Sequence, residues 1–479
     1  MVVLFAQRVF SPIVLIFTAV AFLLLNTAFA NAQTQRVSIL GIEVTQGIQS
    51  MGEGNPRDQS QDNLVDLIKN RKTLIRVYFS KKGAYRAKLN VTNFEDQEGE
   101  WLESALNQHI TVSGLKKRTN LNSSLNFEIP THLLKGNNIT VRSISIVDAS
   151  SNPHSGFACN NCSTYPPLSL PLKDSAPLRL RLIGMSYSVE NKTYTPTEQQ
   201  FKDTLSWLQR TYPISEILLT PQRPTDEPIY ETMAYEGNLF DPSRNDPIDP
   251  QHQLQVCQRA NMALAQRRKD DLSKETNENV RKDLMLTRYV AMLSDTGFPK
   301  KAKKKQFFVG CAQELRNSSD VVATAPVGTT EKNWFSWDQD GYYGDWQVAH
   351  ELAHTLELFH PTSKRCPTSD YPEKRETRIS PPRPSSPQYL GLDFGAQGKP
   401  RKTIPGHWDD LMAYCPKREV TRKDESKWIS PYSYKNLYDQ LNVKVTTSAN
   451  METGHFVTAL ASINLSRKQG FLIYVREAA

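Results

Sequence analysis

The segment 350–360, which reads HELAHTLELFH, constrains this 479-residue chain more than any other feature. His350 and His354 are four residues apart, so on a helix they lie on one face. Their imidazoles can bind one Zn²⁺ from that face, and Glu351 lies beside the remaining coordination position. The segment therefore predicts a helix that carries a metal site.

The third ligand is expected to be His360, six residues after His354. On a straight helix His360 would point away from the shared face, so the helix must end and the chain must turn back. Three neutral histidines leave a fourth position open for water, whose pKa zinc lowers towards ~7. Glu351 can then take the proton as the water attacks a carbonyl, which indicates a hydrolase.

With these residues the segment resembles the signature of the metzincin zinc metallopeptidases, H-E-x-x-H-x-x-G-x-x-H followed by a Met-turn. The candidate Met-turn is the segment 410–415, which reads DLMAYC. The resemblance implies that Met412 forms a hydrophobic floor under the zinc histidines and does no chemistry. It also implies that Tyr414 lies near the zinc and either stabilises the oxyanion or ligates the metal in the resting state.

Two further segments are similar to a group of secreted bacterial metzincin-like peptidases. They are 41–49, which reads GIEVTQGIQ, and 428–434, which reads WISPYSY. The resemblance implies a zinc endopeptidase with a mixed sheet, a long active-site helix and an irregular lower part.

Glu357 stands where the family signature has glycine. That glycine lets the backbone turn with positive φ, which costs a non-glycine residue ~1–2 kcal/mol. Either the fold carries this strain at Glu357 or the turn differs. A rival geometry makes His350, His354 and Glu357 the ligands on a straight helix. Their Cα atoms would then span ~10 Å, too far for three side chains to converge easily on one ion.

Two other functions remain open. The first is a zinc-binding adhesin or surface-binding protein with weak or no catalysis, which Glu357 favours and the intact Glu351 disfavours. The second is another zinc hydrolase, such as an amidase or a deacetylase, which the Met-turn and the long motif disfavour.

Residues 1–32 are typical of a secretory signal peptide. Arg8 precedes an apolar core at 12–25, and the sequences AFA (28–30) and ANA (30–32) offer small-residue cleavage sites. The core is short for a membrane span, and an uncleaved anchor is the alternative. We therefore expect a secreted or periplasmic protein.

Six cysteines, an even number in an exported chain, favour disulfides. Two of them, Cys366 and Cys415, flank the proposed zinc site. The predicted pairs are Cys366–Cys415, Cys159–Cys162 and Cys257–Cys311.

The formal net charge is +8, and the charges are interspersed, so no nucleic-acid partner is indicated. The basic runs at 300–305 and 267–269 are typical of solvated faces. The expected partner is a protein or glycoprotein substrate.

The length of this 479-residue chain predicts a multidomain protein. Residues 33–175 are expected to form an all-β sandwich of immunoglobulin-like shape, which binds substrate, contacts a cell surface or glycan, or supports the catalytic unit. Residues 176–440 are expected to form an α+β metzincin-like catalytic domain with a mixed sheet and the zinc helix at 344–358. Its strand 321–327 is expected at the sheet edge, and the metzincin resemblance implies that the substrate backbone pairs with such an edge. Residues 441–479 are expected to form a short C-terminal β unit.

Overall fold

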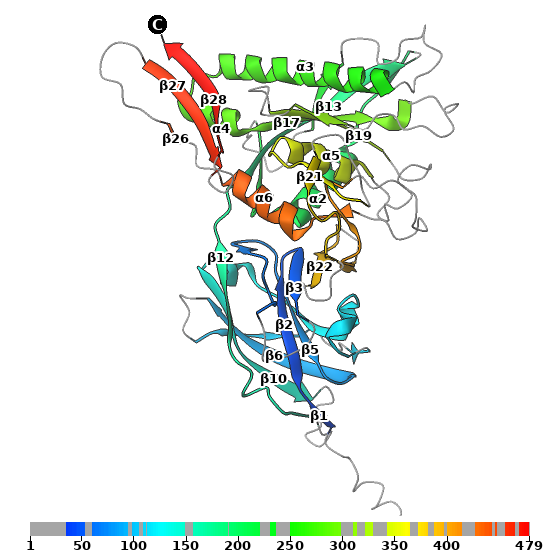
Figure 1. Cartoon of the computed structure of the whole chain (residues 1–479), viewed down its shortest axis with the longest axis vertical. Coiled ribbons are helices and arrows are strands. Elements are labelled where there is room, and N and C mark those ends of the chain that lie inside the picture. Colours follow the sequence, from blue (N-terminus) through cyan, green and yellow to red (C-terminus); the bar gives the residue numbers. More distant parts are fainter. Residues whose placement is uncertain are drawn as a thin grey trace, which may run out of the picture.

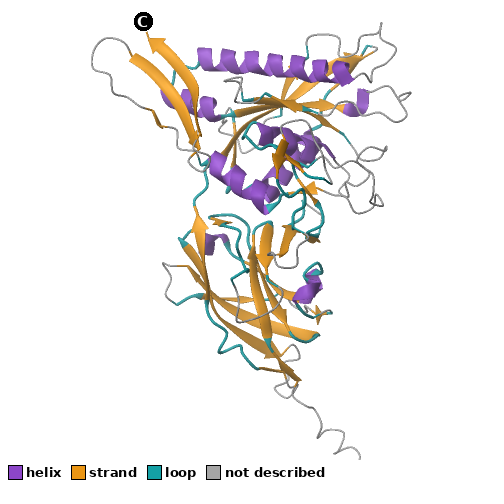
Figure 2. Cartoon of the chain, viewed as in Figure 1, coloured by secondary structure: helices purple, strands orange, loops and turns teal. Residues whose placement is uncertain are grey.

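The computed structural model is a mixed α/β protein, mostly sheet, with five helices among the residues that it describes (Figures 1 and 2). The predicted signal peptide lies outside these residues. The structure describes residues 35–52, 60–93, 98–104, 109–111, 113–148, 157–189, 191–220, 230–235, 250–297, 310–313, 321–328, 343–364, 372–381, 388–396, 400–413, 427–442, 446–447, 456–464 and 469–478.

Two larger sheets and the two-stranded pair β1-β11 occupy the N-terminal part of the chain, while β3 pairs with a strand from later in the chain. One of the larger sheets has the strand order β2-β5-β9, and the other has the order β4-β12-β10-β6-β7 with β8 paired to β6. Short 3-10 turns lie at 115–117, 121–123 and 131–134. The strands are β1 (Gln35–Val37), β2 (Ile39–Thr45), β3 (Ile48–Met51), β4 (Leu67–Ile68), β5 (Leu74–Phe79), β6 (Gly83–Asn93), β7 (Glu100–Glu103), β8 (His109–Ile110), β9 (Ser124–Glu128), β10 (Asn138–Asp148), β11 (Phe157–Cys159) and β12 (Leu168–Lys173).

Apolar side chains from both sheets meet in one core, as expected from the alternation of apolar and polar residues. Val44 and Val77 come from the smaller sheet, and Leu89 and Val141 come from the larger one. The strands expected in this part are therefore present. The immunoglobulin-like shape and the domain boundaries stay predictions.

A mixed sheet of seven strands forms the centre of the next part, with the main order β14-β13-β17-β19-β18. β13, β17 and β19 are parallel, whereas β14 and β18 run antiparallel to their neighbours. β15 and β16 pair in parallel with β13. The strands are β13 (Leu178–Val189), β14 (Lys192–Tyr194), β15 (Ile217–Leu219), β16 (Glu231–Ala234), β17 (Arg288–Ser294), β18 (Cys311–Ala312) and β19 (Val322–Val327).

The expectation that 321–327 forms the sheet edge is wrong. β19 pairs with β17 along its whole length and with β18 at Ala323 and Thr324, so β18 is the outer strand among those described. Pro326 lies outside the two residues that β18 pairs, so its missing N–H removes no bond on that side.

Helices cover both faces of this sheet (Figure 1). Leu182, Val290 and Ala325 point to the face covered by α2, α5 and α6, while Ile183 and Ala291 point to the face covered by α3. A capping box formed by Thr197 and Gln200 begins α2. The helices are α2 (Glu198–Thr211), α3 (Pro250–Lys274), α4 (Glu278–Leu286), α5 (Tyr343–His354) and α6 (Pro431–Leu441). Among them, none is both long and apolar enough to cross a membrane.

Nine strands and α6 follow α5 among the described residues. β22 pairs with β3 and β23, and β26, β27 and β28 form a separate C-terminal sheet, as the alternation there predicted. The strands are β20 (His360–Thr362), β21 (Pro372–Lys374), β22 (Gln388–Asp393), β23 (Lys402–Ile404), β24 (Asp409–Asp410), β25 (Lys427–Trp428), β26 (Thr446–Thr447), β27 (Phe456–Asn464) and β28 (Gln469–Ala478).

The segments 41–49 and 428–434 meet where the N-terminal sheets join the rest of the protein. The carbonyl of Gly47 accepts a hydrogen bond from Trp428 Nε1 at 2.8 Å. Arg71 donates to the carbonyls of Gln46 and Arg210 at 3.1 and 2.9 Å. These segments therefore build the junction between the two parts of the chain.

Candidate metal centre

Helix α5 places His350 in the interior of the protein and His354 at its partly buried C-terminal end. All of its residues from Tyr343 to Ala353 are buried, and its apolar side chains belong to the same core cluster as β13, β17 and β19. The Tyr212 hydroxyl donates to the Ala349 carbonyl at 2.6 Å, which fixes α2 against α5. The two histidines are therefore held on a helix that has little freedom to move.

The end of α5 is a Schellman turn with Glu357 in the left-handed position. Glu357 has φ of 59°. Its N–H bonds to the carbonyl of His354 at 3.0 Å, and the Leu358 N–H bonds to the carbonyl of Ala353 at 3.1 Å. The helix thus stops at His354, four residues before the expected end, and Glu357 carries the strain that its position implied.

The turn brings His360 back to the two helical histidines. Its Nε2 lies 3.0 Å from His350 Nε2 and 2.9 Å from His354 Nε2. This arrangement contradicts the straight-helix alternative, in which Glu357 would have taken the place of His360. The Glu357 carboxylate instead accepts a hydrogen bond from Gln440 Nε2 on α6 at 3.0 Å.

The hydrogen bonds of the helical histidines suit metal binding. His350 Nδ1 lies 3.0 Å from the Leu411 carbonyl, and His354 Nδ1 lies 2.8 Å from the Leu358 carbonyl. A carbonyl only accepts, so each Nδ1 carries the proton and each Nε2 turns its lone pair towards the common centre. Zn–N bonds of about 2.0–2.1 Å in tetrahedral geometry place ligand nitrogens about 3.3 Å apart, close to the observed separations.

Burial keeps these histidines neutral, as ligands must be. Desolvation, followed by the neighbouring rings of His354 and His360, holds the pKa of His350 well below its usual value. Desolvation and His360 lower the pKa of His354 to about 3. Two neutral imidazoles and the third imidazole of His360 therefore form a donor set that fits a divalent zinc ion.

Glu351 lies on α5 directly after the first histidine and is also buried. Its Oε1 accepts a hydrogen bond from Gln347 Nε2 at 3.1 Å, and burial raises its pKa well above the usual value. Gly310 has φ of +92°, and a Cβ at Gly310 would lie 2.6 Å from Glu351 Oε1. Only glycine fits here, because it lets the start of β18 approach the carboxylate. The sequence interpretation missed both Gln347 and Gly310.

The candidate Met-turn orients the first histidine. The Leu411 carbonyl lies 3.1 Å from Trp346 Nε1 as well as facing His350. Met412 is fully buried in the same apolar cluster as Ala349 and Ala353 of α5. The turn is therefore part of the core that supports the histidines.

Three predicted site residues, Tyr414, Cys366 and Cys415, lie outside the described residues, so their roles and the Cys366–Cys415 bridge stay predictions. The other two disulfides are present. One is Cys159–Cys162, with Cα atoms 5.5 Å apart. The other is Cys257–Cys311, which joins α3 to β18 directly beside Gly310.

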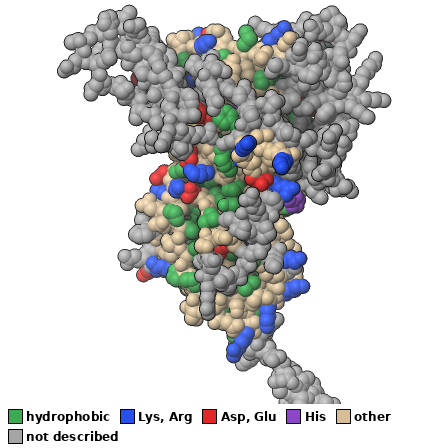
Figure 3. Space-filling view, in the orientation of Figure 1, with side chains coloured by type: hydrophobic (Ala, Val, Ile, Leu, Met, Phe, Trp, Pro, Cys, Tyr) green, Lys and Arg blue, Asp and Glu red, His purple; other side chains and the backbone are tan. Residues whose placement is uncertain are grey.

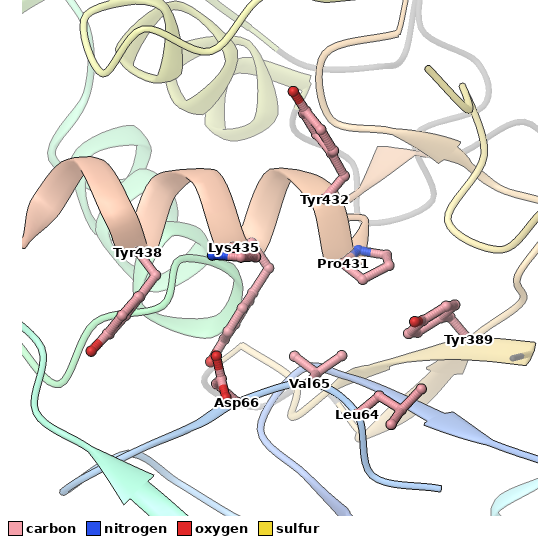
Figure 4. Close-up of a pocket in the computed structure, with 9 residues that line it drawn as sticks. Leu64, Val65, Asp66, Tyr389, Pro431, Tyr432, Lys435 and Tyr438 are labelled. Carbon is pink, nitrogen blue, oxygen red and sulfur yellow. The ribbon is translucent and has the colours of Figure 1, made fainter. Parts of the chain in front are cut away.

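A separate cavity of about 300 Å³ lies between α6 and the N-terminal part (Figure 4). Its charged side chains have partners, since Lys435 pairs with Asp439 at 2.8 Å and Asp66 pairs with Lys173 at 2.7 Å. It contains no zinc ligand and is distinct from the metal centre. Its lining consists of Leu64, Val65, Asp66, Tyr389, Pro431, Tyr432, Tyr434, Lys435 and Tyr438.

Figure 3 shows acidic and basic side chains side by side around the middle of the face, and basic side chains alone along its lower right edge. His350, His354 and His360 are the group with metal-binding geometry among the described residues. No family model, curated protein or solved structure matches the chain. The metzincin resemblance accordingly stays a prediction, and the chemistry of the site is inferred from its geometry.

Proposed function

We propose that the chain is an exported zinc-dependent endopeptidase that hydrolyses peptide bonds in a protein or glycoprotein substrate. The observation that carries this proposal is the convergence of three histidine Nε2 atoms beside a buried helix residue, Glu351, that can act as a base. Export is supported by the signal-like residues 1–32 and by two disulfides.

Each group at the site has a defined role in this proposal. Zinc held by His350, His354 and His360 would polarise the scissile carbonyl and lower the pKa of the attacking water. Glu351 accepts the proton of that water and later gives it to the leaving amine. Gln347 orients the Glu351 carboxylate through its hydrogen bond.

The outer strand β18 is the proposed place for the substrate backbone. It runs antiparallel to β19, and Gly310 immediately before it contacts Glu351. An extended peptide that paired with such an edge would pass close to the base. β18 thus takes the place that the sequence interpretation gave to 321–327.

The main argument for a zinc-binding protein without catalysis was Glu357. Glu357 occupies the left-handed position of the helix end, and the three Nε2 atoms converge regardless. Its presence therefore gives no reason to expect a damaged site.

The test is the variant Glu351→Gln, which removes the base and keeps its size. Peptide cleavage should fall by about two orders of magnitude or more, as expected for loss of a general base, while zinc stays bound. Glu216→Gln, an exposed site, is the matched control and should cleave normally. Unchanged cleavage by Glu351→Gln, or cleavage that survives a chelator, would contradict the proposal.

A further inference from the structure

We propose that Arg375 is a positioning residue of the metal centre, which fixes the segment carrying His360 against the turn that orients His350. The inference rests on the proposed function, because it assigns Arg375 to the zinc site. Arg375 follows β21, whose register pairs Pro372 with His360.

One nitrogen of Arg375 connects the two segments. Its Nη2 donates to the Phe359 carbonyl at 3.0 Å and to Asp410 Oδ1 at 3.2 Å. Phe359 directly precedes His360. Asp410 directly precedes Leu411, whose carbonyl accepts a hydrogen bond from His350 Nδ1. A shift of this guanidinium would therefore be transmitted to both His360 and the partner of His350, and the distance between these two ligands would change.

Asp410 anchors the arrangement from the other side. Its carboxylate accepts hydrogen bonds from Met412 N at 2.9 Å, Ser430 N at 3.2 Å and Ser433 Oγ at 2.6 Å. The Asp410 side chain is fully buried, and that of Arg375 is 6 % exposed. These hydrogen bonds connect the Arg375–Asp410 ion pair to both the Met-turn and the start of α6.

Tyr432 holds the guanidinium from a third direction. Arg375 Cζ lies 4.5 Å from the centroid of the Tyr432 ring, a cation–π distance. Figure 4 shows Tyr432 at the first turn of α6, pointing away from Lys435 and Tyr438. A lysine at 375 would keep the charge but not the planar guanidinium that stacks on this ring.

A purely structural ion pair predicts a different outcome from a positioning role. In the structural case, removing Arg375 lowers the stability of the whole fold but leaves the affinity of folded protein for zinc unchanged. In the positioning case, the affinity itself changes, because groups behind the ligands typically alter it by about 10–100-fold.

The experiment measures zinc affinity by competition with a chelator and the visible absorption spectrum of the Co²⁺-substituted protein. We expect Arg375→Gln to weaken zinc binding by about 10–100-fold and to shift the Co²⁺ bands. Arg375→Lys should lie between this variant and wild type. Lys374→Gln, an exposed neighbour with the same charge change, should match wild type in both measurements.

Tyr432→Leu keeps the Arg375–Asp410 ion pair and removes only the stacking on the guanidinium. If Arg375→Gln does not fold, this variant distinguishes a positioning role of Arg375 from a purely structural one. It should weaken zinc binding about threefold, the equivalent of a cation–π contact of roughly 0.5–1 kcal/mol. If wild type binds zinc and the folded variants match it in affinity and Co²⁺ spectrum, this inference falls and the proposed function stands. If wild type itself binds no zinc, both fall.

Discussion

Two buried polar clusters in this protein differ in the groups that face their polar atoms. In the N-terminal part, Glu43 is surrounded by donors: Arg118 Nη2 lies 2.6 Å from its Oε1, and Arg76 and the Tyr78 hydroxyl approach its Oε2. At the end of α5, three histidine nitrogens instead face one another across about the width of an ion.

The difference separates a structural cluster from a functional one. Arg76 and Arg118 supply the positive charges that balance the Glu43 carboxylate, so this cluster needs no bound ion. The three lone pairs of the histidine cluster repel unless a cation lies between them. Burial alone therefore does not identify a functional site, whereas burial with converging acceptors does.

The largest stability effect should come from the N-terminal cluster. Glu43→Ala leaves Arg76 and Arg118 buried without a counter-charge, which should cost about 3–5 kcal/mol of unfolding free energy. Urea unfolding measures this, and zinc per folded chain should stay at the wild-type value. The exposed Glu103, which pairs with Arg86 and Lys88, gives the control, since Glu103→Ala should change stability little. A small change in the unfolding free energy of Glu43→Ala would contradict the view that the Glu43 cluster is structural and the histidine cluster functional.

The two clusters should also lose stability in different pH ranges once zinc is removed. The pKa of His354 in the folded protein is about 3, below its usual 6.5. The unfolded chain therefore takes up the proton first, and stability falls as the pH drops below about 6.5. Burial raises the pKa of Glu43, but the charges of Arg118 and Arg76 outweigh it and lower the pKa below 4.5. Its contribution is lost only in more acid solution.

Unfolding of chelator-treated protein at a series of pH values tests this. Between about pH 7.5 and 5.5, wild type should lose stability and His354→Ala should lose less, because the variant lacks one of these histidines. Equal losses in the two proteins over that range would mean that His354 is not held neutral by burial.

The smallest effect is expected at Glu357. Glu357→Gly relieves about 1 kcal/mol of backbone strain. It also loses the hydrogen bond to Gln440, worth about 0.5–1.5 kcal/mol, so stability should stay within about 1 kcal/mol of wild type. Zinc affinity should not change. Sharp loss of zinc from Glu357→Gly, with zinc kept by His360→Ala, would restore the straight-helix ligand set.

The local features of the centre were predictable from the sequence. The spacing of His350 and His354 follows from helical geometry, and the ~10 Å span disfavoured Glu357 as a ligand. The choice between a strained Glu357 and a different turn was not decidable, because the Schellman bonds depend on how the chain continues towards His360.

The features that arise from distant contacts were not predictable. Gly310 reaches Glu351 only because β18 pairs with β19, a strand that the sequence interpretation placed at the edge. Arg375 lies in a stretch without periodicity, so nothing local indicated that it joins Phe359 to Asp410. The segment 41–49 was noticed for its resemblance, but its place at the junction depends on partners such as Trp428.

The most direct test of the account is the zinc content of purified mature protein and of His354→Ala. One three-histidine site predicts about one zinc per wild-type chain and almost none in the variant, with His407→Ala, an exposed histidine, as the control that keeps its metal. Full zinc retention by folded His354→Ala, or wild-type protein that binds no zinc, would contradict the central claim that these histidines form a metal centre.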